Sequence, residues 1–228
     1  MYIICGSGRS GTSAVARLLH EGGLSVGRDL IEPDASNPEG YFEERAVVAV
    51  NEAILNDCGL REWFSTANRE EIRDAASCRA EVMRALADEA TPAWKDPRFS
   101  WTLEAWLPFL TEPPRVIVCL RSPAEVAASV MRYYGMVGGE ARRAVEHTWR
   151  VQYERLLEII GEHDLDAMVV EYSALQSDPG AAVTALASFT DARLDASLVR
   201  VDLRHHEAPV PEHLRAIYDD VRALGARR

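Results

Sequence analysis

The sequence predicts an α/β protein, a three-layer fold in which helices flank a central parallel sheet. Three short apolar runs support this prediction, and each is followed by a turn and then a segment with helical spacing: Tyr2–Cys5, Arg115–Leu120 and Ala167–Val170. Continuous apolar runs are typical of strands that are covered on both faces. Their alternation with helices is the pattern of a parallel sheet wrapped by helices.

Length and composition set the outer limits of the fold. The chain has 228 residues, 47% of them hydrophobic, which is enough to bury the core of one large α/β domain. No repeat or low-complexity tract divides it, so we expect a single domain over residues 1–228. The net charge of -11 argues against a general nucleic-acid binder, although arginines can still gather around an anionic pocket.

Cysteine usage and apolar segments indicate where the protein works. The four cysteines form no C-x-x-C pair, and Cys5 and Cys119 lie inside apolar runs, so we expect reduced, structural thiols. The N-terminus has no signal-peptide pattern, and no segment reaches the length of a membrane span. These observations predict a soluble, cytoplasmic protein without a membrane span.

The N-terminal elements follow in order. The first predicted helix has one apolar stripe, formed by Val15, Leu18 and Leu19. Gly22–Gly23 should end this helix, and a short strand is expected near Leu24–Val26. A second helix is predicted to begin around Glu43 and to end at Asp57–Gly59. Its apolar residues share one face: Val47, Val50, Ile54 and Cys58.

The middle of the chain predicts one charged helix, a strand and an apolar helix. Residues Arg69–Glu89 keep a helical period but are strongly charged, which indicates a largely exposed helix rather than a binding tract. A buried strand is expected at Ala93–Lys95. The helix that follows carries four large apolar residues: Trp101, Leu103, Trp106 and Leu107.

Four helices are predicted in the remaining part. Three of them cover Pro123–Tyr134, Glu140–Ile160 and Pro179–Phe189, and the last follows Pro211. The start of the first of these predicts a capping box with proline at the first helical position, formed by Ser122, Pro123 and Glu125.

A Gly-rich loop, GSGRSGTS at Gly6–Ser13, joins the first strand to the first helix, which is the context that phosphate-binding loops require. Its glycines let backbone N–H groups converge on an anion, hydroxyl groups add donors, and the helix start contributes its positive dipole end. A loop of this kind, taken alone, fits an ordinary Gly-rich turn and helix N-cap equally well.

The loop departs from the nucleotide-triphosphate pattern G-x-x-x-x-G-K-[ST]. Gly6, Gly11 and Ser13 fit it, but Thr12 stands where the lysine that reaches the β- and γ-phosphates belongs. This departure argues against an ATPase or kinase. Arg9 instead places a permanent cation within the loop.

A second motif follows the strand Arg115–Leu120. In LRSPAEVAASVMR, Arg121 lies at the carboxyl end of that strand, and Ser129 comes eight positions later on the next helix. Ligands of α/β sheets bind at the carboxyl ends of the strands, so both residues are placed to reach one phosphate. Arg132, one turn after Ser129, is a further candidate.

Both motifs resemble those of sulfotransferases. The R-S-G-T-S arrangement is similar to the 5′-phosphosulfate loop of tyrosylprotein and bacterial enzymes, and Arg121 with Ser129 resembles the family's 3′-phosphate-binding pair. The resemblance implies a P-loop-type fold and the donor 3′-phosphoadenosine 5′-phosphosulfate, without a metal. The donor-binding residues that it implies are Ser7, Gly8, Arg9, Ser10, Gly11, Thr12, Ser13, Arg121 and Ser129.

Other segments are also similar to this family. VVEYSALQSDPGAAVTALASF resembles a late strand, turn and helix of these enzymes, in which Tyr172, Leu175 and Pro179 have structural roles. Arg204 and His205 fall where many members fold a basic loop over the donor. The K-x-G-x-x-G-x-x-K-like element of the cytosolic branch is missing.

The resemblance also implies catalytic residues. Arg9 supplies one cation, and Lys95 resembles the lysine of the K-D-P element, although most lysines are surface residues. Glu43 is the candidate base because it shares the apolar stripe of the second helix, but it equally fits an acidic first-turn residue that stabilises the helix dipole. Glu39 and Glu44 are the alternatives.

The sequence thus predicts transfer of a sulfuryl group to a hydroxyl or amine acceptor, either a small metabolite or a glycan. The alternatives are a nucleotide-dependent kinase and a non-catalytic nucleotide-binding module. Several aromatic residues fit either an acceptor cleft or the core: Trp63, Phe64, Trp101, Trp106, Tyr133 and Tyr134.

Overall fold

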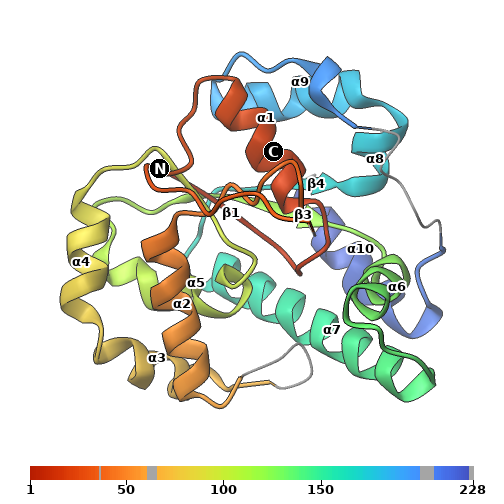
Figure 1. Ribbon diagram of the computed structural model, residues 1–228, viewed down its shortest axis with the longest axis horizontal. Helices are drawn as coiled ribbons and strands as arrows, with labels where there is room; N and C mark the ends of the chain where they lie inside the picture. The colour runs from red at the N-terminus through yellow and green to blue at the C-terminus, as the bar shows by residue number, and fades with distance from the viewer. Residues whose placement is uncertain (36, 61–65, 201–207, 226–228) are drawn as a thin grey trace.

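A four-stranded parallel sheet forms the centre of the molecule (Figure 1). The computed structural model describes residues 1–35, 37–60, 66–200 and 208–225. The strands are β1 (Tyr2–Cys5), β2 (Ala93–Lys95), β3 (Arg115–Leu120) and β4 (Ala167–Glu171), in the order β2-β1-β3-β4. The predicted central parallel sheet is therefore confirmed.

The helices account for most of the remaining chain. Their bounds are α1 Thr12–Glu21, α2 Arg45–Asp57, α3 Arg69–Ser77, α4 Ala80–Asp88, α5 Phe99–Trp106, α6 Pro123–Tyr134, α7 Gly139–Glu162, α8 Tyr172–Ser177, α9 Pro179–Thr190 and α10 Arg215–Leu224. Short 3-10 helices lie at η1 Leu107–Phe109, η2 Ala196–Leu198 and η4 Glu212–Leu214. Among the helices so described, none combines the length and the apolar character needed to cross a bilayer.

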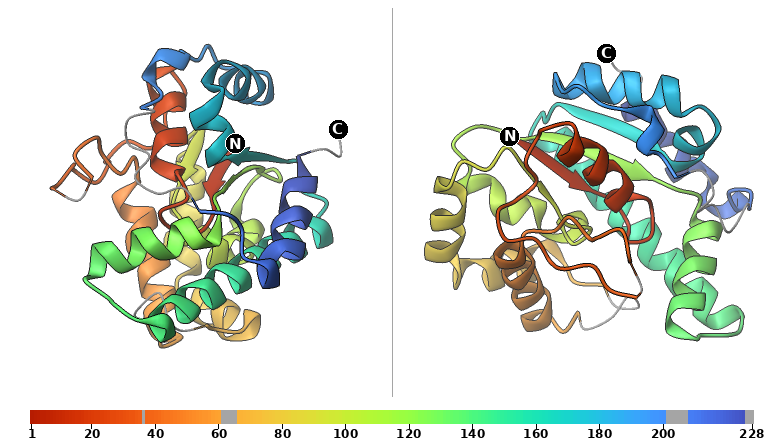
Figure 2. Two further views of the ribbon diagram at one scale, coloured as in Figure 1. Left: turned by 90° about the vertical axis from the view of Figure 1, so that its right-hand side faces the viewer. Right: turned by 45° about the horizontal axis from the view of Figure 1, so that its top comes forward.

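Each face of the sheet has its own apolar core, because successive strand residues point to opposite faces. Ile3 and Cys5 face one core, to which α2, α5 and α7 contribute, and Ile4 faces the other, built with α1 and α9. Figure 2 shows these helices on the two sides of the sheet. The three predicted layers, helix, sheet and helix, are confirmed.

The register of the sheet decides where its carboxyl edge lies. Ile4 of β1 pairs with Lys95 of β2 on one side and with Ile117 of β3 on the other. The chain that leaves β1, the last residue of β2 and the chain that leaves β3 therefore emerge at the same edge. This edge carries the segments that the sequence singled out.

The expected strand near Leu24–Val26 is wrong. This segment runs beside the start of β2 but shares one backbone hydrogen bond with it, from Ala93 N to Ser25 O (3.1 Å). Gly23 and Gly27 flank the segment with φ of 88° and 156°, so the chain turns at both ends before a ladder can form.

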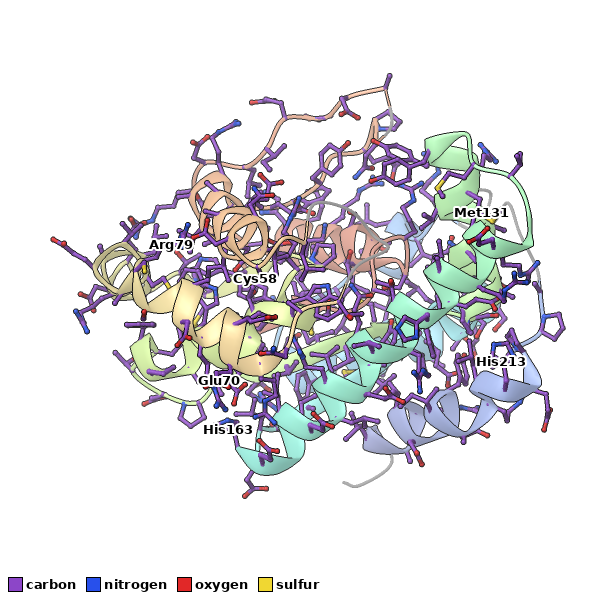
Figure 3. All side chains as sticks on the ribbon, turned by 90° about the horizontal axis from the view of Figure 1, so that it is seen from below. Cys58, Glu70, Arg79, Met131, His163 and His213 are labelled. Atoms are coloured by element: carbon purple, nitrogen blue, oxygen red, sulfur yellow. The ribbon has the colours of Figure 1, made fainter. Side chains whose placement is uncertain are left out.

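The expected single helix over Arg69–Glu89 is two helices. The chain breaks at Arg79, whose φ of -118° and ψ of 9° are not helical. The Arg79 side chain pairs with Asp57 at the end of α2 (2.8 Å), and Figure 3 shows Arg79 beside Cys58. The two helices are mostly exposed, as predicted, and the break lets each bury apolar residues, Ile72 on α3 and Met83 on α4.

An ion cluster ties α3 to α5 and α7. Arg69 of α3 donates to Glu104 of α5 through Nε (2.8 Å) and to Glu162 of α7 through Nη1 (2.9 Å). Arg73 also pairs with Glu104. Hydrogen bonds from Arg69 are the main reason that the pKa of Glu104 is lowered to about 2.

Candidate active site

The Gly-rich loop requires glycine near both of its ends, at Gly6 and Gly11. Gly6 has a φ of 139°, and a Cβ there would lie 2.4 Å from the backbone oxygen of Cys119 on β3. Gly11 has a φ of 95°, and a Cβ there would lie 2.7 Å from the ring of Tyr172. Arg9 also adopts a left-handed conformation, with a φ of 63°. The loop thus packs tightly against β3 and α8.

A buried tyrosine holds the loop from inside. The Tyr153 hydroxyl donates to the Cys119 backbone oxygen (2.5 Å) and accepts from Ser7 N (3.3 Å). Burial raises the pKa of Tyr153, which keeps the hydroxyl protonated. Ser7 and Ser10 are both 1% exposed, and the Ser10 hydroxyl donates to the Ser7 backbone oxygen. These two serines therefore shape the loop instead of lining a cavity.

Two cavities meet at the loop. The larger cavity, about 860 Å³, extends from the loop past β2 to α7, and the smaller cavity, about 570 Å³, lies between α1, α6 and α8. The residues that line both are Arg9, Thr12, Ser13, Asn37 and Tyr133. Gly8 lines the larger cavity and Gly11 the smaller. The start of α1 therefore forms a common wall.

The smaller cavity is strongly basic. Its described lining includes five arginines, Arg9, Arg17, Arg121, Arg132 and Arg200, against a single carboxylate, that of Glu39. The whole chain has a net charge of -11, so this concentration runs against the overall composition. Such a cavity favours a ligand that carries several negative charges.

Arg121 and Ser129 converge on the loop, although they lie more than a hundred residues from it in sequence. Arg121 stacks on the ring of Tyr172 (4.2 Å from the centroid) and donates through Nη1 to the Arg9 backbone oxygen (3.1 Å). The Arg9 side chain donates through Nε to the Ser129 hydroxyl (3.2 Å). The structure thus brings the two predicted motifs together at one cavity. Tyr172, expected to be structural, also lines that cavity.

The predicted capping box at α6 is wrong, although Pro123 does occupy the first turn. The Ser122 hydroxyl has no hydrogen-bond partner among the described residues. Glu125 pairs with Arg121 instead, with Nε 2.8 Å from Oε2. The buried guanidinium needs a counter-charge, and this demand outweighs the capping interaction.

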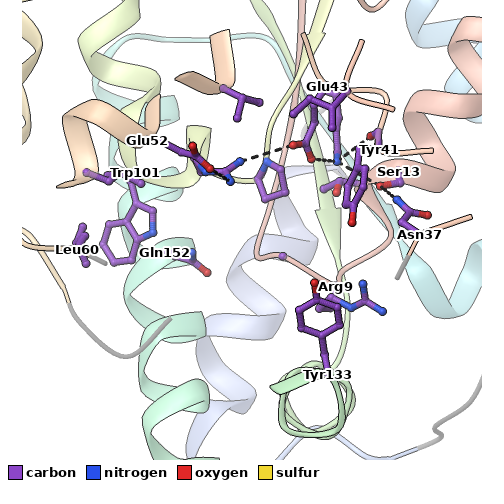
Figure 4. Close-up of a pocket in the computed structure, with 18 of the residues that line it drawn as sticks. Arg9, Ser13, Asn37, Tyr41, Glu43, Glu52, Leu60, Trp101, Tyr133 and Gln152 are labelled. Carbon is purple, nitrogen blue, oxygen red and sulfur yellow. Dashed lines mark hydrogen bonds and ion pairs between the residues drawn. The ribbon is translucent and has the colours of Figure 1, made fainter. Parts of the chain in front are cut away.

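The larger cavity contains a buried ion pair. The Lys95 ammonium pairs with the Glu43 carboxylate and donates to the Ser13 hydroxyl (3.2 Å) and the Tyr41 backbone oxygen (3.1 Å; Figure 4). The Lys95 side chain is 2% exposed, so it is no surface lysine. Its contact with Ser13 connects β2 to the Gly-rich loop.

Glu43 is surrounded by both signs of charge. The Arg98 guanidinium lies 3.6 Å from its second carboxylate oxygen and is itself held by Asp96 at 3.0 Å. Burial raises the pKa of Glu43, and Lys95 opposes this rise. The carboxyl group is thus a better proton acceptor, when ionised, than an exposed glutamate would be.

The structure distinguishes the three candidate bases by position. Glu43 lies before the helix rather than in its first turn, since α2 begins at Arg45, and it faces the larger cavity. Glu44 is the residue before α2, and its carboxylate accepts from the backbone N–H of Arg28 (2.6 Å). Glu39 lines the smaller cavity and pairs with Arg17 and, at 2.6 Å, with Arg200.

The aromatic candidates divide between the core and the larger cavity. Trp106 is fully buried in the core, whereas Trp101, Tyr133 and Tyr134 line the cavity. Four of the residues singled out in the sequence lie outside the described residues, namely Trp63, Phe64, Arg204 and His205.

Several residues of the site were missed by sequence reasoning. They are Arg17, Asn37, Tyr41, Arg98, Thr148, Gln152, Tyr153 and Arg200. Arg98 had a local signal, since it follows the Asp-Pro turn after Lys95. Tyr153 had none, because it belongs to the apolar face of a long helix and reaches the loop only in three dimensions.

The fold and the site define a class: an α/β protein with a Gly-rich loop and an arginine-lined cavity at the carboxyl edge of a parallel sheet. Comparison with known proteins gives the family. The model of the sulfotransferase family matches residues 2–196, and the chain belongs to this family. Its members are transferases of sulfuryl groups. No curated protein sequence matches the chain.

Two solved structures share the fold. The sulfotransferase domain from the curacin biosynthetic pathway is 16% identical, with a TM-score of 0.55, and the match covers 97% of each chain. The sulfotransferase domain from the Synechococcus PCC 7002 olefin synthase is 17% identical, with a TM-score of 0.52, over 98% of this chain and 87% of that one. At this identity the likeness concerns the fold alone.

Proposed function

We propose that this protein transfers a sulfuryl group from 3′-phosphoadenosine 5′-phosphosulfate to a hydroxyl acceptor, with a small metabolite as the acceptor. One observation carries the proposal: a cavity lined by five arginines meets a second cavity at the Gly-rich loop, beside a buried Lys95–Glu43 pair. The smaller cavity would hold the donor, and the larger cavity would hold the acceptor.

The proposed donor site uses both motifs. Arg121 and Ser129 would bind the 3′-phosphate, while Thr12, Ser13 and the backbone of Gly8 and Gly11 would bind the 5′-phosphosulfate at the start of α1. Ser7 and Ser10 belong to the same site, where their buried positions support a role in holding the loop. Arg9 lines both cavities. This position supports its role as a cation beside the sulfuryl group, which would pass from one cavity to the other.

The proposed reaction is a direct displacement. Glu43 accepts the proton of the acceptor hydroxyl as its oxygen bonds to sulfur, and the bond from sulfur to the 5′-phosphate oxygen breaks. The electron pair leaves with 3′,5′-adenosine bisphosphate. Lys95, through its contact with Ser13, and Arg9 are placed to stabilise the charge that develops on the leaving oxygen, so the proposal assigns no metal.

Ligand-induced thermal stabilisation tests the proposal directly. We expect 3′,5′-adenosine bisphosphate to raise the melting temperature and ATP with magnesium to have little effect, since Thr12 replaces the lysine of nucleotide triphosphatases. Stabilisation by ATP with magnesium alone would overturn the proposal in favour of a kinase. Donor binding without transfer of labelled sulfate to any of a wide acceptor panel would identify a non-catalytic nucleotide-binding module.

Two broader expectations belong to the same proposal. The four cysteines are all free thiols, with Cys5 and Cys119 buried, which supports action in a reducing compartment such as the cytoplasm. The family match over residues 2–196 supports one sulfotransferase domain in residues 1–228.

A further inference from the structure

The larger cavity contains two buried polar groups that the fold does not use. Thr148 and Gln152 lie one turn apart on α7, line the cavity and are 2% and 3% exposed. Neither the Thr148 hydroxyl nor the Gln152 Oε1 has a hydrogen-bond partner among the described residues. Buried polar atoms normally have partners, because leaving them without one is costly. A pair of them facing one cavity indicates a place where a ligand supplies the missing bonds.

This place is separate from the reacting end of the cavity. Figure 4 shows Gln152 and Trp101 on one side of the cavity, and Ser13 and Glu43 on the other. Apolar side chains contribute to the wall, namely Val48, Leu55, Leu60 and Trp101, beside the polar Glu52, Asn56 and Arg98. A ligand that contacts both sides therefore has two polar ends, and the apolar part of the wall favours an apolar segment between them.

The chemistry of the two groups selects what can bind them. The Gln152 Oε1 accepts a hydrogen bond, while the Thr148 hydroxyl can donate one. A carboxylate has no proton to donate to Gln152, and an ammonium group that donates to both side chains leaves the Thr148 proton without an acceptor. A neutral hydroxyl can do both at once.

We propose that Thr148 and Gln152 form a second acceptor subsite that binds a hydroxyl other than the reacting one. The acceptor is then a neutral molecule with at least two hydroxyl groups separated by an apolar segment. The inference rests on the proposed function, since it takes the larger cavity to be the acceptor site.

Calorimetric binding to the full chain saturated with 3′,5′-adenosine bisphosphate tests this subsite. The probes are linear diols with one hydroxyl at each end, in a series of lengths, and mono-alcohols of the same lengths. We expect one length of diol to bind about tenfold more tightly than its mono-alcohol, as one or two neutral hydrogen bonds would give. Equal binding at every length would overturn the inference.

Two substitutions locate the effect. Thr148→Val and Gln152→Met should each reduce the preference for the diol without lowering the melting temperature, because neither removes a hydrogen bond within the fold. Thr184→Val on α9, away from both cavities, is the matched control and should keep the preference. A diol preference that survives both cavity substitutions would place its origin elsewhere. Failure to bind the bisphosphate would count against the proposed function, and the diol comparison would still be made on the unloaded protein.

Discussion

At the residue scale, the chemistry of this site depends on burial combined with opposite charge. Lys95 and Glu43 lie almost entirely out of solvent, yet each has a partner of the other sign. A lone charge in such a place would lose its charge or destabilise the fold. The pair therefore keeps a cation and a proton acceptor beside the loop at the same time.

The first prediction concerns Glu43. Glu43→Gln should lower kcat by about a hundredfold to ten-thousandfold, the usual loss when a general base is removed, while binding of 3′,5′-adenosine bisphosphate is retained. The kcat/KM of the wild type should fall as the pH is lowered, because a protonated Glu43 cannot take up the proton of the acceptor hydroxyl. Burial raises the pKa of Glu43, so the midpoint of this fall should lie above 4.5, the ordinary value for glutamate.

Two controls separate this role from a structural one. Glu44→Gln removes the charge of a half-buried neighbour that accepts a hydrogen bond from the backbone of Arg28. This variant should still lose kcat/KM at low pH as the wild type does. Glu39→Gln, in the smaller cavity, should instead change the affinity for 3′,5′-adenosine bisphosphate. If Glu43→Gln keeps the wild-type rate and profile, Glu43 is not the base.

The second prediction concerns Arg121. Arg121→Gln should weaken binding of 3′,5′-adenosine bisphosphate roughly tenfold to a hundredfold, as expected for the loss of one charged hydrogen bond. Adenosine 5′-phosphate, which lacks the 3′-phosphate, should bind the variant and the wild type alike. Calorimetric titration with both ligands gives the comparison. An equal loss for both would mean that Arg121 acts through its contact with the Arg9 backbone.

At the element scale, the decisive feature is how closely the Gly-rich loop lies against β3 and α8. Gly6 and Gly11 combine positive φ with neighbours that leave no space for a side chain. This packing aims the N-terminus of α1 at the junction of the two cavities. The Gly-rich loop is thus positioned by the sheet as much as by its own sequence.

The third prediction tests that packing. Gly6→Ala should strongly lower the melting temperature and weaken donor binding, because the new Cβ would overlap the Cys119 backbone oxygen. Gly23→Ala is the matched control: its φ of 88° is also positive, but nothing lies within 4 Å of a Cβ there. Gly23→Ala should lower the free energy of unfolding by about 1–2 kcal/mol, which is the cost of placing a residue with a Cβ in a left-handed backbone conformation. Equal destabilisation by the two changes would show that steric contact with β3 is unimportant.

The elements themselves were largely predictable from sequence. The strands were found because each is apolar on both faces, and α6 was predicted with its observed bounds from its proline start and its helical period. One error arose at a tertiary contact and the other from local backbone conformation. The helix that the local pattern would continue breaks at Arg79, which pairs with Asp57, and the positive φ of Gly23 and Gly27 prevents a strand between them.

At the scale of the whole molecule, distant segments are tied together by ions as well as by apolar packing. Arg69, Arg73, Glu104 and Glu162 connect α3, α5 and α7 on one side of the molecule, where Figure 3 shows Glu70 and His163. Glu104 is the centre of this cluster. α5 and α7 also supply Trp101 and Gln152 to the larger cavity, so the cluster supports a wall of the site.

The fourth prediction follows from the pKa of Glu104. Its folded-state value of about 2 lies below the ordinary 4.5, so the group stabilises the fold above that ordinary value and loses this contribution as pH falls towards 2. Glu104→Gln should therefore lower the melting temperature near neutral pH, with the difference shrinking between about pH 4.5 and pH 2. Glu158→Gln, an exposed neighbour 3.9 Å from Arg69, should show little change. A difference that stays constant with pH would contradict the assignment.

Only part of the site could be predicted from sequence. Lys95 is the last residue of a predicted strand, and Arg121 and the loop each directly follow one. Parallel strands present their carboxyl ends at one edge of a sheet, so this rule predicts that these residues lie together. Tyr153 and Arg200 follow no such rule. They belong to a long helix and an irregular segment, and only the packing of the whole chain brings them to the loop and the smaller cavity.

The wall shared by the two cavities has a consequence for the kinetics of the proposed reaction. Arg9, Thr12 and Ser13 border both cavities, so a donor and an acceptor bound as proposed would occupy the protein together, and the sulfuryl group would pass between them in one step. Initial rates measured while both substrates are varied should then give intersecting rather than parallel double-reciprocal lines. Parallel lines would require a sulfated enzyme that outlives the departure of the first product. With a single displacement, a sulfuryl group made chiral with oxygen isotopes should reach the acceptor with its configuration inverted.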